Sequence, residues 1–229
     1  MVEPGGGRLL IDTGNAPWNG STNFGDSVLE LTFPGLERRQ AYTPTDQEQL
    51  NNGDTDLGSS APALLSEDRV VLAGKDGSCG CSRSRAWTAG RRRRARRSAG
   101  KSSALRSPAA ASCSPHPRCG AGADAQRCFV AGENGTGAYV MRRGRLYLAW
   151  QNHTPGTSPV MAGGLLYVYD PSAGGIDVYR PGSPNPIAKL PGGPGHWNSS
   201  IVVDGHVVEP EGNANDHSLS GTLEIFSAG

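Results

Sequence analysis

The chain has 229 residues, with 33 glycines and 17 prolines, and its formal net charge is +1. This length suits one all-β domain, and so much glycine and proline favours a turn-rich β protein over a helical one. No apolar run is long enough to span a membrane, and no secretory signal is visible in the N-terminal segment.

The low net charge conceals two parts of opposite composition. Of the 22 lysines and arginines, 12 lie in residues 78–127, whereas only one of the 21 acidic residues, Asp124, lies there. The rest of the chain therefore carries 10 basic and 20 acidic residues. All five cysteines lie in or beside the basic segment: Cys79, Cys81, Cys113, Cys119 and Cys128.

The first 77 residues alternate short apolar runs with turn-rich loops. Leu9–Ile11 and Ser27–Phe33 predict two strands, because each apolar run is bounded by Gly, Asn, Asp or Pro. Residues 36–58 are polar and rich in turn formers, which predicts an irregular connection. Residues 59–77 predict the first clear hairpin, with Val70–Leu72 followed by a glycine turn.

Residues 78–128 differ from both flanks. Between 78 and 127 there is no Val, Ile, Phe, Tyr or Met, and Leu105 is the one leucine. A segment so poor in strand formers is not expected to supply two blade strands. It is either disordered or an out-of-frame translation of a GC-rich gene, because Arg, Ala, Ser, Pro, Gly and Cys are what such codons then encode.

After residue 128 the strand pattern returns. Residues 129–150 predict two strands around the turn Arg142–Gly144, and Leu165–Tyr169 with Ile176–Tyr179 predicts a hairpin. Further strands are predicted at Ile201–Val203, Val207–Val208 and Thr222–Phe226.

One unit recurs through these strands: a small residue or proline, a strand, a tight turn, a second strand and a glycine turn. It begins at Pro62, Pro159 and Ser200, and the last two lie 41 positions apart, within the roughly 40–50 residues of one β-propeller blade. We therefore predict an all-β fold, a partial β-propeller of four-stranded antiparallel blades, of about four blades. Blades would occupy 8–77 and 129–229, separated by the disordered Arg/Ala/Ser-rich insert 78–128.

Three stretches in the N-terminal part resemble a known family. The loop Thr13–Asn19, TGNAPWN, followed by Gly25–Ser27, resembles the TGNPAPWN…GDN stretch of quinoprotein alcohol dehydrogenases, which bind pyrroloquinoline quinone (PQQ). Asp56, in DTDLGSSAPALL, follows 41 positions after Asn15 and is similar to the segment with their catalytic aspartate. Gly74–Gly77, GKDG, resembles the turn whose cation contacts the quinone.

The resemblance implies a role for one residue of each stretch. Asn15 would be a side-chain oxygen ligand of Ca²⁺, a hard cation that takes such ligands. Asp56 would be the general base that accepts the alcohol proton, and Lys75 would hydrogen-bond the quinone oxygens during reduction. Each residue also has a plain structural interpretation, because Asn15, Asp56 and Lys75 all lie in turns.

The chain departs from the family pattern at several points. The proline after the ligand asparagine is missing, and Thr55 stands where the family has tryptophan. The family's metal-binding glutamate, the tryptophan under its quinone and its vicinal disulfide have no counterpart here.

Two other candidate sites are weaker. The run Arg91–Arg97 suggests nucleic-acid or anionic-surface binding, but no aromatic residues are interleaved with it. The cysteine spacings and a late acidic and histidine cluster match no zinc ligand frame. The members of that cluster are His196, His206, Glu211, Asp216 and His217.

Three functions follow from these patterns, and the sequence leaves open whether the chain is an enzyme. The first is a PQQ-binding-like propeller that acts as a binding or scaffold module without activity. The second is a PQQ- and Ca²⁺-dependent alcohol or sugar dehydrogenase, and the third is a basic nucleic-acid binder. The partner of the chain would be a small alcohol or sugar if it is a dehydrogenase, or another protein bound through open blade edges. The family usually works outside the cytoplasm.

Overall fold

The computed structural model describes residues 2, 6–66, 69–75, 78–83, 99–101, 110–114, 127–143, 145–195, 198–212 and 220–227. These residues form five small antiparallel sheets and two short helical segments. Every strand pairs with the strand next to it in the sequence, so each sheet is a meander. The predicted all-β fold of blade-type antiparallel sheets is confirmed.

The first and second sheets contain seven strands, and the two helical segments lie between them in sequence. The first sheet consists of β1 (Gly7–Asp12), β2 (Val28–Phe33) and β3 (Arg38–Tyr42). The helical segments are α1 (Gln47–Asn52) and η1 (Leu57–Ser59). The second sheet consists of β4 (Ala63–Ser66), β5 (Arg69–Ala73), β6 (Ser78–Arg83) and β7 (Ala99–Lys101).

The other three sheets contain eleven strands. The third sheet consists of β8 (Ala110–Ser114), β9 (Arg127–Gly132), β10 (Gly135–Arg142) and β11 (Arg145–Gln151). The fourth consists of β12 (Thr157–Ala162), β13 (Leu165–Tyr169), β14 (Ile176–Tyr179) and β15 (Pro186–Leu190). The fifth consists of β16 (Ile201–Val203), β17 (His206–Glu211) and β18 (Thr222–Ser227).

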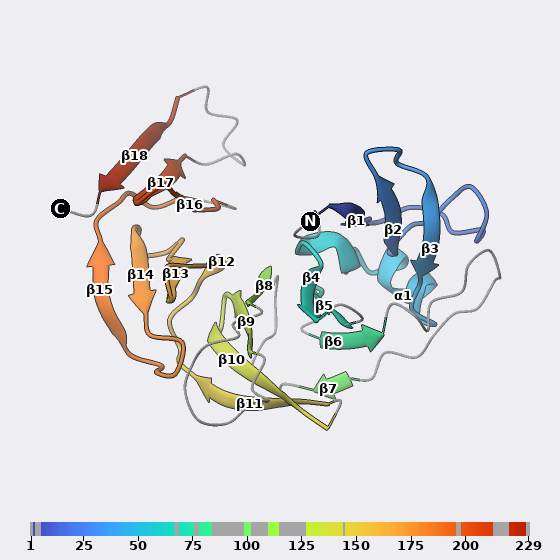
Figure 1. The fold of residues 1–229 in the computed structure, drawn as a ribbon, viewed down its shortest axis with the longest axis horizontal. Coiled ribbons are helices and arrows are strands. Elements are labelled where there is room, and N and C mark those ends of the chain that lie inside the picture. Colours follow the sequence, from blue (N-terminus) through green and yellow to red (C-terminus); the bar gives the residue numbers. More distant parts are fainter. Residues whose placement is uncertain are drawn as a thin grey trace.

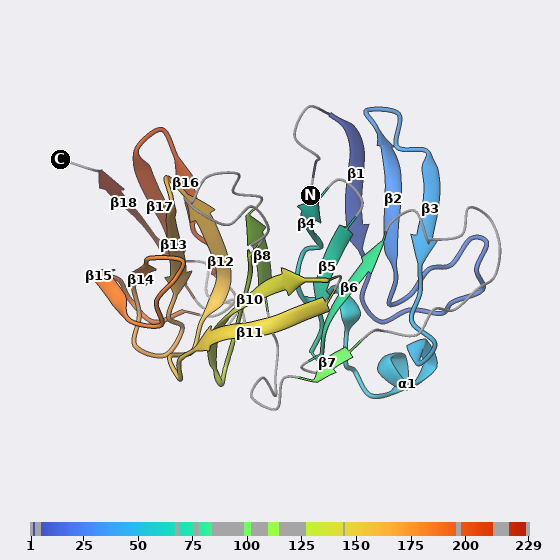
Figure 2. The ribbon, with the colours of Figure 1, turned by 60° about the horizontal axis from the view of Figure 1, so that its bottom comes forward.

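The sheets follow one another around an open arc. Figure 1 shows them in chain order, from the blue first sheet through the green and yellow sheets to the red fifth sheet. The first and fifth sheets lie at opposite sides of the arc, and Figure 2 shows them apart in a second view. Each sheet is therefore a neighbour only of the sheets before and after it.

The core lies between neighbouring sheets rather than at one centre. Successive residues of a strand point to opposite faces, so β5 serves two interfaces. Val70 and Leu72 pack with Leu10 of the first sheet, whereas Val71 packs with Val130 of the third sheet. Strands that are buried on both faces are expected to be apolar throughout, as Val70–Ala73 of β5 are.

The interface between the third and fourth sheets is built on aromatic rings. Trp150 lies 6.2 Å from Phe129 and 6.1 Å from Tyr179 between ring centroids. Its indole nitrogen donates a hydrogen bond to the Pro181 carbonyl at 2.9 Å. Trp150 thus packs the third and fourth sheets together.

The connection 36–58 is more ordered than predicted. It contains β3 and α1 in place of an irregular segment. The polar sequence of β3 does not prevent pairing, because an edge strand needs only backbone hydrogen bonds to β2 and can leave Arg38 and Arg39 in solvent. Similarly, 129–150 holds parts of three strands rather than two, because the Glu133–Asn134 turn divides the first apolar run.

The basic segment also differs from its prediction where it is described. Its backbone supplies β6, β7 and β8, although we did not expect two blade strands there. The segment lacks the apolar and β-branched side chains that are typical of strands, but its pairing with β5 and β9 depends on backbone groups. Leu72 pairs with Gly80, and Phe129 pairs with Ser112. With these strands the described residues form five sheets, where about four blades were predicted. Arg91–Arg97 lies outside the described residues, and an out-of-frame origin stays a prediction.

Phe129→Ala tests the inter-sheet core. Phe129 is fully buried, so truncation is expected to lower the free energy of unfolding by about 3–5 kcal/mol. Tyr147→Ala in the same sheet is the matched control, because that ring is largely exposed and its loss should cost under about 1 kcal/mol. Urea denaturation followed by circular dichroism measures both, and equal losses would contradict the layered core.

Candidate functional site

The loop between β1 and β2 is held by its own polar residues. The Asp26 amide donates to the Gly14 carbonyl at 2.9 Å, and the buried Asp26 carboxylate accepts from the Leu57 amide at 3.0 Å. Gly58 packs so closely that a Cβ there would lie 2.6 Å from the Thr13 carbonyl carbon. These contacts fix the loop of the first sheet against the segment that leads to the second sheet.

This packing brings the three predicted site residues together. The Asn15 backbone amide donates to Asp56 Oδ1 at 2.9 Å, and Lys75 Nζ lies 2.5 Å from Asp56 Oδ2. The Lys75 amide also donates to the Asp56 carbonyl at 3.0 Å. Asp56 therefore joins the first loop to the turn after β5, and both its carboxylate oxygens have partners.

Asp54 is a fourth member that the sequence reasoning missed. Its Oδ1 accepts from Asn15 Nδ2 at 2.6 Å, and its Oδ2 lies 3.7 Å from Lys75 Nζ. The backbone of Asp54 is left-handed (φ 50°), a conformation that Asp tolerates better than most residues. The spacing of two carboxylates one residue apart, in Asp-Thr-Asp, was the signal available for it.

The ion pair shifts the pKa values of both its members. Burial acts to raise the pKa of Asp56, but the hydrogen bonds from Lys75 and Asn15 outweigh it, and the pKa is lowered. The hydrogen bond to Asp56 raises the pKa of Lys75 despite partial burial. Both groups therefore stay charged at neutral pH, and Asp56 is a weaker base than a free aspartate.

Asp12 precedes this loop at the end of β1. Its Oδ2 is buried without a hydrogen-bond partner among the described residues. Burial raises the pKa of Asp12 to about 6, although a hydrogen bond with its own backbone acts in the opposite direction. Ionisation of the Asp12 carboxyl therefore lowers the stability of the folded chain.

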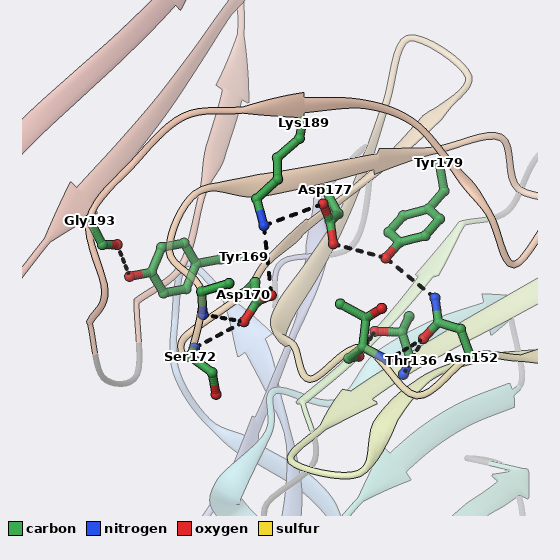
Figure 3. A network of polar contacts seen from close by, with 11 residues as sticks. Thr136, Asn152, Tyr169, Asp170, Ser172, Asp177, Tyr179, Lys189 and Gly193 are labelled. Carbon is green, nitrogen blue, oxygen red and sulfur yellow. Dashed lines mark hydrogen bonds and ion pairs between the residues drawn. The ribbon is translucent and has the colours of Figure 1, made fainter.

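A second polar network lies in the fourth sheet (Figure 3). Lys189 Nζ lies 3.8 Å from Asp170 Oδ2 and 3.9 Å from Asp177 Oδ1. The Tyr179 hydroxyl donates to Asp177 Oδ2 at 3.2 Å and accepts at 3.3 Å from Asn152, which directly follows β11 of the third sheet. Burial, and then the Asp177 charge, raise the pKa of Tyr179 to about 12. This network joins two sheets and keeps the phenol protonated.

The late cluster does not form a metal site among the described residues. No group of three His, Cys, Asp or Glu side chains gathers anywhere in the part of the chain that the structure describes. His206 and Glu211 stand at opposite ends of β17, and the remaining members, His196, Asp216 and His217, lie outside the described residues. None of the helices in the described part of the chain is long and apolar enough to cross a bilayer.

Comparison with known proteins gives likenesses of fold. No family model matches the chain, and neither does any curated protein. The computationally designed Ika4 protein is 12% identical, with 74% of this chain and 92% of that chain covered, at a TM-score of 0.47. BamB from Moraxella catarrhalis is 12% identical, with 81% of this chain and 49% of that chain covered, at a TM-score of 0.49.

A third similar structure is the computationally designed Ika8 protein. It is 11% identical, with 88% of this chain and 52% of that chain covered, at a TM-score of 0.46. The chain thus spans about half the length of BamB and of Ika8. The chain is an all-β protein whose small antiparallel sheets resemble propeller blades.

A double-mutant cycle tests the Asp56–Lys75 pair. Asp56→Asn and Lys75→Met are each expected to lower the free energy of unfolding, with a coupling of about 1 kcal/mol at pH 7, since both side chains keep some contact with solvent. Because the Asp56 pKa is lowered, this coupling is present above pH 3.8 and is lost as the pH falls through the folded pKa. Asp54→Asn, at a largely exposed carboxylate, is the control with a smaller effect.

Asp12→Asn tests the raised pKa. A carboxyl with a folded pKa of about 6, against 3.8 unfolded, is stabilising below pH 3.8, and this stability is lost as the pH rises to 6. The variant should therefore exceed the unmodified chain in stability at pH 7 by up to about 3 kcal/mol. Urea midpoints at pH 4.5 and pH 7 measure this, and an equal difference at both values would contradict it.

Proposed function

We propose that the chain is a PQQ-binding-like propeller that acts as a binding scaffold without catalytic activity. The observation that supports this is the closed ion pair of Asp56 and Lys75. Both oxygens of the Asp56 carboxylate are engaged, by Lys75 and by the Asn15 amide. In this proposal the cluster around Asp56 and Lys75, which we call the Asp56–Lys75 latch, holds the first sheet to the second.

The protonation state of Asp56 supports the same conclusion. A general base for alcohol oxidation needs a free lone pair and a pKa near the working pH. The Asp56 pKa is lowered instead, and Lys75 holds the oxygen that would accept the proton. Asp56 in this arrangement serves binding between the two loops better than it serves proton transfer.

The donor set, as arranged, does not fit Ca²⁺. Ca²⁺ takes six to eight oxygen ligands, and carboxylate and amide oxygens are of the right kind. However, the ammonium of Lys75 lies between Asp54 and Asp56, and Asn15 turns its Nδ2 toward Asp54. A cation of the protein itself thus neutralises the charge that would attract the metal.

The second candidate is a PQQ- and Ca²⁺-dependent dehydrogenase of alcohols or sugars. The observation in its favour is that Asp56 contacts both Asn15 and Lys75 in the folded chain, although the three residues were chosen by resemblance alone. This candidate requires Lys75 to leave Asp56 so that the quinone and the metal can enter. A quinone bound there would supply the two-electron oxidation.

Titration with PQQ and Ca²⁺ separates the two candidates. For the scaffold we expect no saturable change in tryptophan fluorescence with micromolar PQQ and no dye-linked oxidation of ethanol or glucose. Asp56→Asn should then change stability only. Saturable PQQ binding that requires Ca²⁺, together with oxidation that Asp56→Asn abolishes and Asp54→Asn retains, would overturn the scaffold and establish the dehydrogenase.

A further inference from the structure

The two end sheets differ from the three inner sheets in how their faces are used. The second, third and fourth sheets each pack one face on the preceding sheet and the other on the following sheet. Among the described residues, the first and fifth sheets each pack one face on a neighbouring sheet, and no other described sheet covers the second face.

The free face of the fifth sheet is apolar. Val202 and Val207 point toward the fourth sheet, where they pack with Tyr169. Their neighbours point the other way, and cross-strand pairing lines them up: Ile201 pairs with Val208, which pairs with Ile225. Four large apolar side chains on this outer face are more than half exposed: Ile201, Val203, Leu223 and Ile225.

The outer face of the first sheet is also apolar, but four of its five apolar side chains are half-buried. Leu10 and Val28 point toward the second sheet and are fully buried there. The register places Leu9 opposite Leu31 and Ile11 opposite Leu29 on the other face. Phe33 extends this row at the end of β2, and 45% of its surface is exposed.

Strands with apolar residues on both faces are typical of sheets that are covered on both sides. A sheet that met solvent on one face would instead alternate apolar with polar residues. Ile201–Val203 and Leu9–Ile11 show no such alternation. Exposed apolar patches of this kind mark interaction sites.

We infer that these two faces bind each other between two copies of the chain, head to tail. We call the outer face of the fifth sheet the tail face (Ile201, Val203, Val208, Leu223, Ile225) and that of the first sheet the head face (Leu9, Ile11, Leu29, Leu31, Phe33). Within the chain, each sheet packs one face on the sheet that follows it in sequence, and that next sheet uses its other face for the sheet after it, as far as the fifth sheet. The tail face of one copy continues this series onto the head face of a second copy.

The partner is therefore a second copy of the same chain, and the contact is heterologous. Such contacts give a ring if the rotation closes and a longer chain of copies if it does not. The inference rests on the proposed scaffold function, because it names the partner that the scaffold binds. It uses none of the residues of the Asp56–Lys75 latch.

Two blocked variants test the inference. The tail variant carries Leu223→Glu and Ile225→Glu, and the head variant carries Phe33→Glu and Leu29→Glu. Sedimentation velocity between about 1 and 100 µM should show association of the unmodified chain and at least about tenfold weaker association of each variant. An equimolar mixture should form a dimer, because it keeps one intact head face and one intact tail face.

Controls keep each outcome decisive. The variant with Tyr147→Glu and Ile187→Glu changes two equally exposed apolar residues away from both end faces and should associate like the unmodified chain. Circular dichroism checks that each variant folds. If a double variant fails to fold, Phe33→Ser replaces the head variant and Leu223→Ser replaces the tail variant.

Three results would overturn the inference. They are a monomer at every concentration, association that neither variant weakens, and association of the head variant alone through its tail face. Quinone-dependent oxidation would instead overturn the proposed function without bearing on association, so the two failures are distinguishable.

Discussion

The structure depends on one constraint: a sheet of three or four short strands cannot bury its apolar side chains by itself. Each face has to be covered by another sheet, and here the neighbour in sequence provides the cover. Val70 and Val71 show this most directly, because adjacent residues of one strand belong to different interfaces. The arc, the aromatic contacts of Trp150 and the polar links between sheets all follow from this arrangement.

Polar residues join neighbouring sheets at two places in this arrangement. They do so by hydrogen bonds and an ion pair. Asp56 links the first loop to the turn after β5, and Asn152 links the third sheet to Tyr179 of the fourth. Apolar faces thus provide the packing energy, while these contacts fix the relative positions of the sheets.

Much of the fold could be predicted from local patterns, and the limits have physical causes. Leu165–Tyr169 and Ile176–Tyr179 match β13 and β14 because apolar runs bounded by Gly and Asp specify their own ends. By contrast, β3 and β6 pair through the backbone, which leaves no apolar pattern to detect. The meeting of Asn15, Asp56 and Lys75 was predictable through resemblance, but Asp54 needed the geometry of the turn.

The meander within every sheet makes nearly all strand pairing local in sequence. Contacts between residues close along the chain form with little loss of entropy, which favours rapid assembly of each sheet. Since each sheet touches only its neighbours, stability behaves as a sum over sheets and the interfaces between them. Amide hydrogen exchange is consequently expected to be graded, slowest in the third sheet and fastest at both ends of the series.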